Sequence, residues 1–184
     1  MGNFIINIST MQANKSFRKI MFPVFSYINE ILIKLLNLCP PVLRKLVFKI
    51  ILKKFGKNSF IDYNFYFRYP RKIEIGNDVE INRGFQVYPS FLTKDAYIKI
   101  GNNVVIAPNV HLYGTGQDPN NITKDIASSI IIGDQSYIGA DSIIRYGVRI
   151  GDGSIIGAGS VVVSDVMKGS TVAGNPARII KKSR

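Results

Sequence analysis

Residues 132–167 read IGDQSY IGADSI IRYGVR IGDGSI IGAGSV VVSDVM, which is six blocks of six residues without a gap. Every block opens with a branched aliphatic residue, and its fifth place holds Ser or Val. Glycine takes the second place in four of the six blocks. A short fixed period of this kind is typical of a parallel β-helix, in which each block forms one short strand and one corner.

The six-residue period also predicts where each side chain lies. An amphipathic helix needs apolar residues every three or four positions, and this stretch lacks that spacing. We expect the first residue of each block to point into a shared interior and the fifth to fill the space beside a corner. Glycine is expected where the backbone takes a positive φ or packs closely. Three blocks make one triangular coil, and coils stacked about 4.8 Å apart bury the core together.

The same register extends toward the start of the chain, with coils opening at Phe55, Ile75 and Ile100. It is interrupted twice, by an insertion at about 89–99 and again between Leu112 and Ile132. The second interval is 20 residues long where six would suffice. A loop of about 14 extra residues in a compact solenoid is usually functional or disordered.

Residues 1–54 follow a different pattern. Apolar residues recur every three or four positions over 15–38 and 42–54, which predicts two amphipathic helices, with Pro23 starting or kinking the first. From Met1 to Lys57 there are ten Lys or Arg and one acid, so this part carries +9 of the formal net charge of +12. We therefore expect a basic helical region, 1–54, followed by a β-helix domain with a C-terminal tail, 55–184.

The basic helices allow two interpretations. Charged residues and prolines keep their apolar stretches shorter than the roughly 18–20 residues of a membrane span. Residues 15–54 could instead lie on an anionic membrane surface, or pack on the β-helix or a second subunit. No secretory signal is recognised, so we expect a cytoplasmic protein, peripheral at the inner face of the membrane. No nucleic-acid motif accompanies the charge, and no nucleic-acid partner is expected.

The repeats resemble the hexapeptide-repeat acyltransferases, and within them the sugar O-acetyltransferases, a group that includes the maltose, galactoside and exopolysaccharide acetyltransferases. The resemblance runs from about Phe55 to the end and is carried by four stretches: INRG at 81–84, IGNNVVIAPNV at 100–110, IGAGSVV at 156–162 and AGNPAR at 173–178. It implies a mainly β fold, a left-handed parallel β-helix. The handedness comes from the resemblance alone, since the general rule for parallel crossovers would favour the right-handed form.

The resemblance further implies acetyl-CoA as acyl donor and, as acceptor, a saccharide such as a surface polysaccharide or its precursor. It also implies a homotrimer with sites between subunits, and no metal. The three-histidine metal site of the carbonic anhydrases built on this fold is excluded, because His111 is the only histidine in the sequence. Cys39, the single cysteine, offers no cluster of ligands either.

Chemistry is expected in the long loop. In the sugar acetyltransferases a loop histidine acts as general base, taking a proton from the hydroxyl that attacks the thioester. Its position here is Gln117, and an amide does not titrate near neutral pH. The protein is thus either an O-acetyltransferase that works without the usual base or a catalytically impaired scaffold. His111 is the alternative base, although the sixth place of its block points outward.

The resemblance also assigns binding positions. Asn82 matches an asparagine that faces the acceptor sugar, or it is simply a corner residue. Asp118 is a weaker candidate, either a base of low pKa or the turn residue before Pro119. Six positions match contacts to coenzyme A: Ala140, Ala158, Val163, Ser164, Arg178 and Lys181. The two basic residues suit phosphate groups unless they belong to a solvated tail, and Ser164 replaces a lysine common in relatives.

Overall fold

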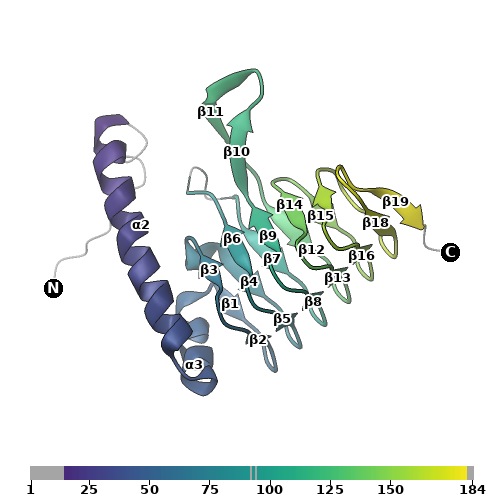
Figure 1. Cartoon of the computed structure of the whole chain (residues 1–184), viewed down its shortest axis with the longest axis horizontal. Helices are drawn as coiled ribbons and strands as arrows, with labels where there is room; N and C mark the ends of the chain where they lie inside the picture. Colours follow the sequence, from purple (N-terminus) through teal and green to yellow (C-terminus); the bar gives the residue numbers. More distant parts are fainter. Residues whose placement is uncertain (1–14, 92, 94, 182–184) are drawn as a thin grey trace. The chain divides into compact units, whose positions relative to one another are not determined.

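The computed structural model describes residues 15–91, 93 and 95–181, and for 15–20 the backbone alone. The chain divides into two compact units, one ending at Leu38 and one starting at Cys39. Helix α2 (Lys15–Leu38) belongs to the first unit. Helix α3 (Pro41–Ile51), the short 3-10 helix η1 (Pro70–Lys72) and all the strands of the described residues belong to the second (Figure 1).

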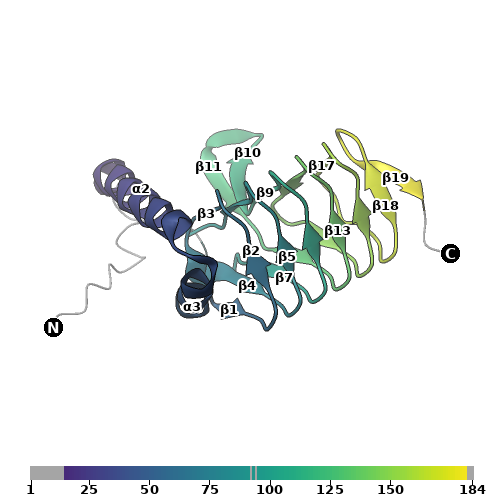
Figure 2. The ribbon, with the colours of Figure 1, turned by 60° about the horizontal axis from the view of Figure 1, so that its bottom comes forward.

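Apart from the antiparallel pair β10 (Thr115–Asp118) and β11 (Asn121–Ala127), the described strands of the second unit form three sheets of parallel strands, the faces of a triangular prism (Figures 1 and 2). Face A contains, in spatial order, β1 (Lys54–Phe55), β4 (Ile73–Ile75), β7 (Ile98–Ile100), β12 (Ile130–Ile132) and β15 (Arg149–Ile150). Face B contains β2 (Phe60–Ile61), β5 (Glu80–Ile81), β8 (Val105–Ile106), β13 (Tyr137–Ile138), β16 (Ile155–Ile156) and β18 (Thr171–Ala173), with β19 (Arg178–Lys181) added antiparallel at its end. Face C contains β3 (Tyr66–Phe67), β6 (Gln86–Tyr88), β9 (His111–Tyr113), β14 (Ile143–Arg145) and β17 (Val161–Val162). The chain visits the faces in the order A, B, C and then starts the next coil, as a parallel β-helix requires.

The first residue of each repeat points into the prism, as expected. The six residues concerned are between 0 and 2% exposed: Ile132, Ile138, Ile144, Ile150, Ile156 and Val162. They stack in register from coil to coil, Ile138 opposite Ile156 and Ile144 opposite Val162. Each coil thus covers the apolar ladder of the next, which is how the stacked coils bury a core together.

The fifth residue ties neighbouring coils together. Ser136 and Ser142 are buried, and their hydroxyls donate to the carbonyls of Gly151 and Gly157 one coil further on, at 3.1 and 3.0 Å. A small residue at this place therefore both fits the corner and satisfies a buried backbone acceptor.

Close packing explains the second-place glycines. A Cβ added to Gly139 would lie 2.5 Å from the backbone nitrogen of Ala158, closer than any real contact. Positive φ falls instead on the fourth place of the block, at Gln135 (59°) and Asp141 (59°). Of the two reasons expected for glycine, packing thus applies to the second place, and backbone conformation to the fourth.

The insertion before β7 is held by a lysine. Lys72 Nζ donates to the carbonyl of Ala96 at 3.3 Å and also to the carbonyl of Thr93. Burial of the ammonium group lowers the pKa of Lys72. Its place between two carbonyls makes Lys72 an anchor for the inserted loop.

Helix α3 corrects one expectation, since it ends at Ile51 rather than at residue 54, because the chain enters β1 at Lys54. The sequence left open whether this helix lies on a membrane or packs on the β-helix. In the structure its packed side holds Arg44, which is 3% exposed, and Phe48, which is 2% exposed. The aliphatic residues at 42, 43, 46 and 50 are exposed.

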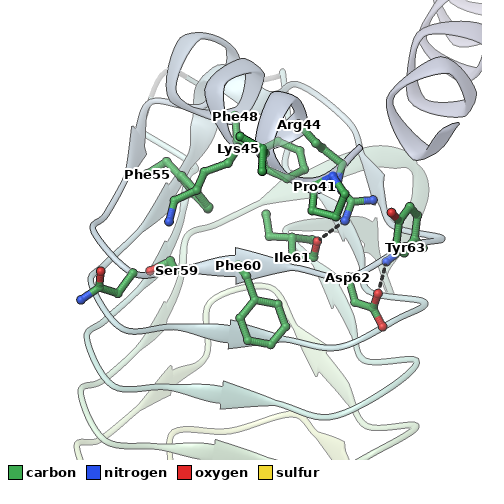
Figure 3. Close-up of a pocket in the computed structure, with 12 residues that line it drawn as sticks. Pro41, Arg44, Lys45, Phe48, Phe55, Ser59, Phe60, Ile61, Asp62 and Tyr63 are labelled. Carbon is green, nitrogen blue, oxygen red and sulfur yellow. Dashed lines mark hydrogen bonds between the residues drawn. The ribbon is translucent and has the colours of Figure 1, made fainter. Parts of the chain in front are cut away.

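The physical reason for this orientation is the open end of the prism. Strand β2 is the last strand of face B, so no strand beyond it can bond the Ile61 carbonyl. Arg44 Nη2 donates to that oxygen at 3.0 Å, and Figure 3 shows the bond. The ring of Phe48 closes the interior against Phe65, with centroids 5.1 Å apart. Helix α3 is therefore a cap, which solenoids need at their terminal repeats.

Helix α2 continues through Pro23 without a break. Its residues Met21–Leu38 have a mean hydropathy of 1.2 and are long and apolar enough to cross a membrane, by length and composition alone. This differs from the expectation that charges and prolines shorten the stretch too far. Glu30 and Lys34 are the only charged residues between Met21 and Leu38, and Lys34 Nζ lies 3.6 Å from Glu30 Oε1, one helical turn away.

Candidate functional site

The long interval after Leu112 forms an ordered hairpin. Its strands are β10 (Thr115–Asp118) and β11 (Asn121–Ala127), paired antiparallel, and the hairpin projects from the prism between β9 and β12 (Figure 1). At its base the amide of Gly114 donates to the carbonyl of Tyr88 at 2.9 Å, and Ser128 N donates to Gly114 O at 3.2 Å. The loop expected to be functional is thus a built element fixed to face C.

Gln117 lies on β10, exposed, and pairs across the hairpin with Asp125. Its amide Nε2 donates to Asp125 Oδ1 at 3.3 Å. The amide oxygen can accept and the second amide hydrogen can be donated, so Gln117 can hold a hydroxyl but cannot take its proton near neutral pH.

Asp118 has a structural role at the hairpin turn. Its Oδ1 accepts the backbone N–H of Asn120 at 3.0 Å, and its Oδ2 lies 3.5 Å from Lys124 Nζ. Both oxygens have partners within the hairpin, which favours the interpretation of Asp118 as a turn residue.

His111 lies on the outer side of β9, as its place in the block predicts. It is half-buried, and the buried Leu112 beside it points inward. Its Nδ1 is 3.3 Å from the hydroxyl of Tyr113, and its strand neighbours are Gln86 and Ile143. Thus His111 has one ring nitrogen next to a phenol and belongs to face C, not to the hairpin itself.

Face C carries a row of polar and aromatic side chains that the sequence analysis missed. Tyr88 and Tyr113 stack with centroids 5.1 Å apart and planes 10° apart, and Arg145 follows in register on β14. Each of the three stands 13 residues after the first residue of its coil, at Ile75, Ile100 or Ile132. That constant offset is the signal that could have revealed the row.

Tyr146 joins this row to the hairpin. A Cβ added to Gly116 would meet the Tyr146 ring, which shows that the ring packs directly on the hairpin backbone. Arg145 Nη2 donates to the Tyr146 hydroxyl at 2.9 Å, and the guanidinium carbon lies 4.4 Å from the ring centroid. The residue next to Gln117 is thus supported by an ordered Arg–Tyr pair.

Asn82 lies at the corner after β5, and its Nδ2 donates to the carbonyl of Ile106 on the next coil at 3.0 Å. This bond supports its interpretation as a corner residue.

The coenzyme positions fall into separate groups in the single chain. Ala140 and Ala158 follow β13 and β16, one coil apart, and the amide of Gly159 donates to Ala140 O at 2.8 Å. Val163 and Ser164 follow β17, at the corner beyond face C. The two alanines therefore lie one above the other in successive coils, at the corner after face B. Val163 and Ser164 lie at a different corner, after face C.

The basic residues near the C-terminus lie on an exposed strand. Arg178 and Lys181 begin and end β19, opposite Ala173 and Thr171, and both are exposed. Arg178 and Ser164 line one pocket of about 400 Å³. Among the described residues, no group of three or more His, Cys, Asp or Glu is placed to hold a metal ion.

Comparisons with known proteins agree with this geometry. The sequence family described as bacterial transferase hexapeptide (six repeats) matches residues 129–164. The galactoside O-acetyltransferase of Escherichia coli (strain K12) is 34% identical over 144 residues, which cover 76% of this chain and 68% of that protein.

Two solved structures have the same fold. A galactoside acetyltransferase in complex with coenzyme A has a TM-score of 0.75 at 31% identity, covering 87% of this chain and 81% of that one. A hexapeptide-repeat acetyltransferase of Vibrio cholerae O1 biovar eltor, in complex with acetyl-coenzyme A, has a TM-score of 0.73 at 27% identity, covering 83% and 85%. These likenesses confirm the left-handed parallel β-helix. Because the aligned 144 residues are 34% identical and cover 68% of the galactoside enzyme, the chain belongs to the hexapeptide-repeat acetyltransferases of the galactoside O-acetyltransferase type.

Proposed function

We propose that the protein is an acetyl-CoA-dependent O-acetyltransferase that acts on a hydroxyl of a saccharide. The observation that carries the proposal is the hairpin of residues 115–127, an ordered element that presents Gln117 beside face C in a chain of this family. Acetyl-CoA and coenzyme A are the ligands of the two solved relatives, which supports the same donor here.

The proposed reaction transfers an acetyl group from the sulfur of coenzyme A to the hydroxyl oxygen of the acceptor. The acceptor oxygen attacks the thioester carbonyl carbon, the carbon–sulfur bond breaks, and coenzyme A leaves as a thiolate that takes a proton. The proton of the acceptor hydroxyl must also leave. Gln117 orients this hydroxyl through its amide, and the proton passes to water, because an amide is no base at neutral pH. His111, which has a titratable ring on face C, is the alternative proton acceptor.

The donor would be held by the positions assigned above. Main-chain groups at Ala140 and Ala158 would line the pantetheine arm, and Val163 and Ser164 the far corner. Arg178 and Lys181 would meet the phosphates, supported by the pocket that Arg178 shares with Ser164. Asn82 would face the acceptor sugar through its amide oxygen.

The assembly and the acceptor are further parts of the proposal. The two groups of coenzyme positions lie on different corners of one chain, which supports a homotrimer in which neighbouring subunits complete each site. We propose a surface polysaccharide or its precursor as acceptor, made at the inner face of the membrane. Residues 1–54 would attach the protein there, and residues 55–184 would carry catalysis.

A non-catalytic role is the second candidate. The observation that favours it is the amide at position 117, already paired with Asp125, in place of a titratable side chain. Such a protein would keep the fold and the donor groove and serve as a scaffold.

The decisive experiment follows thiol release from acetyl-CoA by the full chain, with galactosides and oligosaccharides as acceptors. Acceptor-dependent release supports the O-acetyltransferase and excludes the scaffold. If neither the unaltered protein nor Gln117→His releases thiol above the rate with buffer alone, the enzymatic proposal is wrong. Asn121→His, on the same hairpin, is the matched control for adding an imidazole.

A further inference from the structure

Helix α3 has the opposite orientation to that of an ordinary helix on a soluble protein. Its charged residue Arg44 is 3% exposed. Four of its six aliphatic residues are exposed: Val42 at 76%, Leu43 at 53%, Leu46 at 53% and Ile50 at 66%. We call these four residues the aliphatic strip.

The cap fixes this orientation. Arg44 bonds the Ile61 carbonyl, and its guanidinium carbon lies 4.0 Å from the centroid of the Tyr63 ring. Phe48, one turn later, fills the end of the core. Rotating α3 to bury the aliphatic strip would break the bond to Ile61 and withdraw Phe48, so the strip must face outward.

An outward aliphatic strip indicates a partner. Four neighbouring aliphatic side chains that remain in water forgo the favourable free energy of burying their apolar surface. Contiguous apolar surface with a polar rim marks interaction sites on proteins or membranes. The strip needs a partner that is apolar at its centre.

The charge around the strip indicates which partner. Lys45 and Lys49 flank it on the same helix, and Lys54 and Lys57 follow on the first coil. No acidic residue occurs from Cys39 to Ile61. A second copy of this chain, with a net charge of +12, would bring the same positive rim against this one, and like charges across an interface are costly.

The neighbouring pocket combines exposed aromatic rings with basic residues and one acid, Asp62, whose Oδ1 accepts the backbone N–H of Tyr63 at 2.7 Å. It has a volume of about 390 Å³ and lies between α3 and the first coil, where Figure 3 shows Lys45, Phe60 and Tyr63 around it. Phe60 is 48% exposed and Tyr63 is 42% exposed. Exposed aromatic rings next to lysines are common where a protein meets the polar boundary of a bilayer.

We propose that α3 docks this end of the solenoid on an anionic lipid bilayer. The aliphatic strip enters the boundary of the acyl chains, and the lysines meet the lipid phosphates, which is the usual arrangement of an interfacial helix. This refines the attachment proposed above for residues 1–54 by naming the element and the side chains that meet lipid. It does not depend on acyl transfer.

A local probe tests the docking in the full chain, because helix α2 could itself bind lipid. In a Cys39→Ser background, a cysteine replaces Leu46 and carries an environment-sensitive fluorophore. Vesicles contain phosphatidylcholine with or without phosphatidylglycerol, and a lipid-attached quencher is added. We expect a blue shift and quenching at position 46 with the anionic vesicles. Ile122→Cys, at a residue 78% exposed on the hairpin, is the matched control and should stay in water.

Three results would overturn the proposal. The protein could fail to bind the anionic vesicles. It could bind while the probe at position 46 reports water, so that another segment makes the contact. The probe could also be buried without lipid, with sedimentation showing association, in which case the strip is an interface between copies.

A charge variant adds an independent readout. Replacing Lys45 and Lys49 by Gln should weaken partitioning onto anionic vesicles by about 30-fold, since each lysine near such a surface contributes about 1 kcal/mol. Lys99→Gln with Lys168→Gln makes the same change in net charge away from α3 and should have a much smaller effect. Equal weakening by the two pairs would contradict a docking surface on α3. Without vesicles, the variant with Gln at positions 45 and 49 should transfer acetyl groups to a soluble acceptor at an unchanged rate. Loss of membrane binding can therefore be distinguished from loss of the proposed enzymatic activity.

Discussion

The solenoid body and the hairpin of residues 115–127 differ in where their side chains find partners. In the body, Ile138 stacks on Ile156, and the Ser142 hydroxyl bonds the Gly157 carbonyl, so each residue depends on the next coil. In the hairpin, Gln117 bonds Asp125, and Thr115 Oγ1 donates to Ile126 O at 3.1 Å, both within the same element. A change in the body therefore affects two coils, while the hairpin can change its chemistry with the fold intact.

The largest effect is expected where the coils are closest. Gly139→Val would push side-chain carbons onto the backbone of Ala158, where even a Cβ would lie 2.5 Å from nitrogen. Overpacking typically costs about 1–3 kcal/mol, and we expect the upper end of that range here because the backbone cannot move aside as a side chain can. Thermal unfolding followed by circular dichroism measures it. The control is Ala158→Val, on the other side of this contact, where the side chain is exposed. Its free energy of unfolding should change by no more than about 0.5 kcal/mol. Equal losses of stability in the two variants would show that the contact at Gly139 is not tight.

The hairpin should respond in activity instead of stability. Gln117→His supplies a titratable base where the amide can only orient the hydroxyl, and general-base catalysis is typically worth about 10²–10⁴ in rate. We expect at least a 10²-fold rise in turnover with a thermal midpoint unchanged. Thiol release from acetyl-CoA gives the rate.

The alternative base gives a second arm to this experiment. His111→Ala should leave the turnover of the unaltered chain within about twofold if the proton passes to water. A fall of about 10²-fold would identify His111 as the base. Such a fall would also show that face C, and not the hairpin alone, carries the chemistry.

The contrast between body and hairpin also decides what could be predicted from the sequence. The ladder of Ile132 and its equivalents was readable because a period of six admits one arrangement of inward residues. The position of Gln117 followed from the resemblance, but its partner Asp125 did not, since their pairing depends on the hairpin register. The row of Tyr88, Tyr113 and Arg145 was detectable by its constant offset within the coil and was overlooked.

Helix α3 shows a different limit. Periodicity correctly predicted an amphipathic helix after Pro41 but did not decide which of its faces packs on the β-helix. The choice between faces depended on one unpaired carbonyl, that of Ile61, at the edge of face B. Edge carbonyls are invisible until the strand order is known, so hydrophobicity alone could not have placed Arg44.

The cap predicts an effect of intermediate size. Arg44→Met keeps much of the side-chain volume but leaves the Ile61 carbonyl buried without its donor. An unsatisfied buried acceptor costs about 1–3 kcal/mol, and this loss should appear as a lower midpoint in urea unfolding. Lys49→Met, on the exposed side of the same helix, is the matched control and should change the midpoint little. If Arg44→Met raised stability, the buried guanidinium would destabilise the cap. The bond from Arg44 to Ile61 could then not explain why the aliphatic strip faces outward.

The smallest effect is expected for a hydrogen bond between the corners of two neighbouring coils of the body. Asp134 Oδ1 accepts the backbone N–H of Asn102 at 2.7 Å, and this bond, with further bonds from the Asn102 side chain, lowers the pKa of Asp134. Because the pKa is lower in the folded than in the unfolded chain, ionised Asp134 stabilises the fold above the ordinary pKa of about 3.9. That contribution is lost as the pH falls through the folded-state pKa. Asp134→Asn keeps an acceptor oxygen at this position but removes the titrating group. The unfolding free energy of this variant should therefore fall less between pH 6 and pH 3 than that of the unaltered chain. Parallel curves over this window would show that the charge on Asp134 adds nothing and that the corner bond alone holds the two coils together.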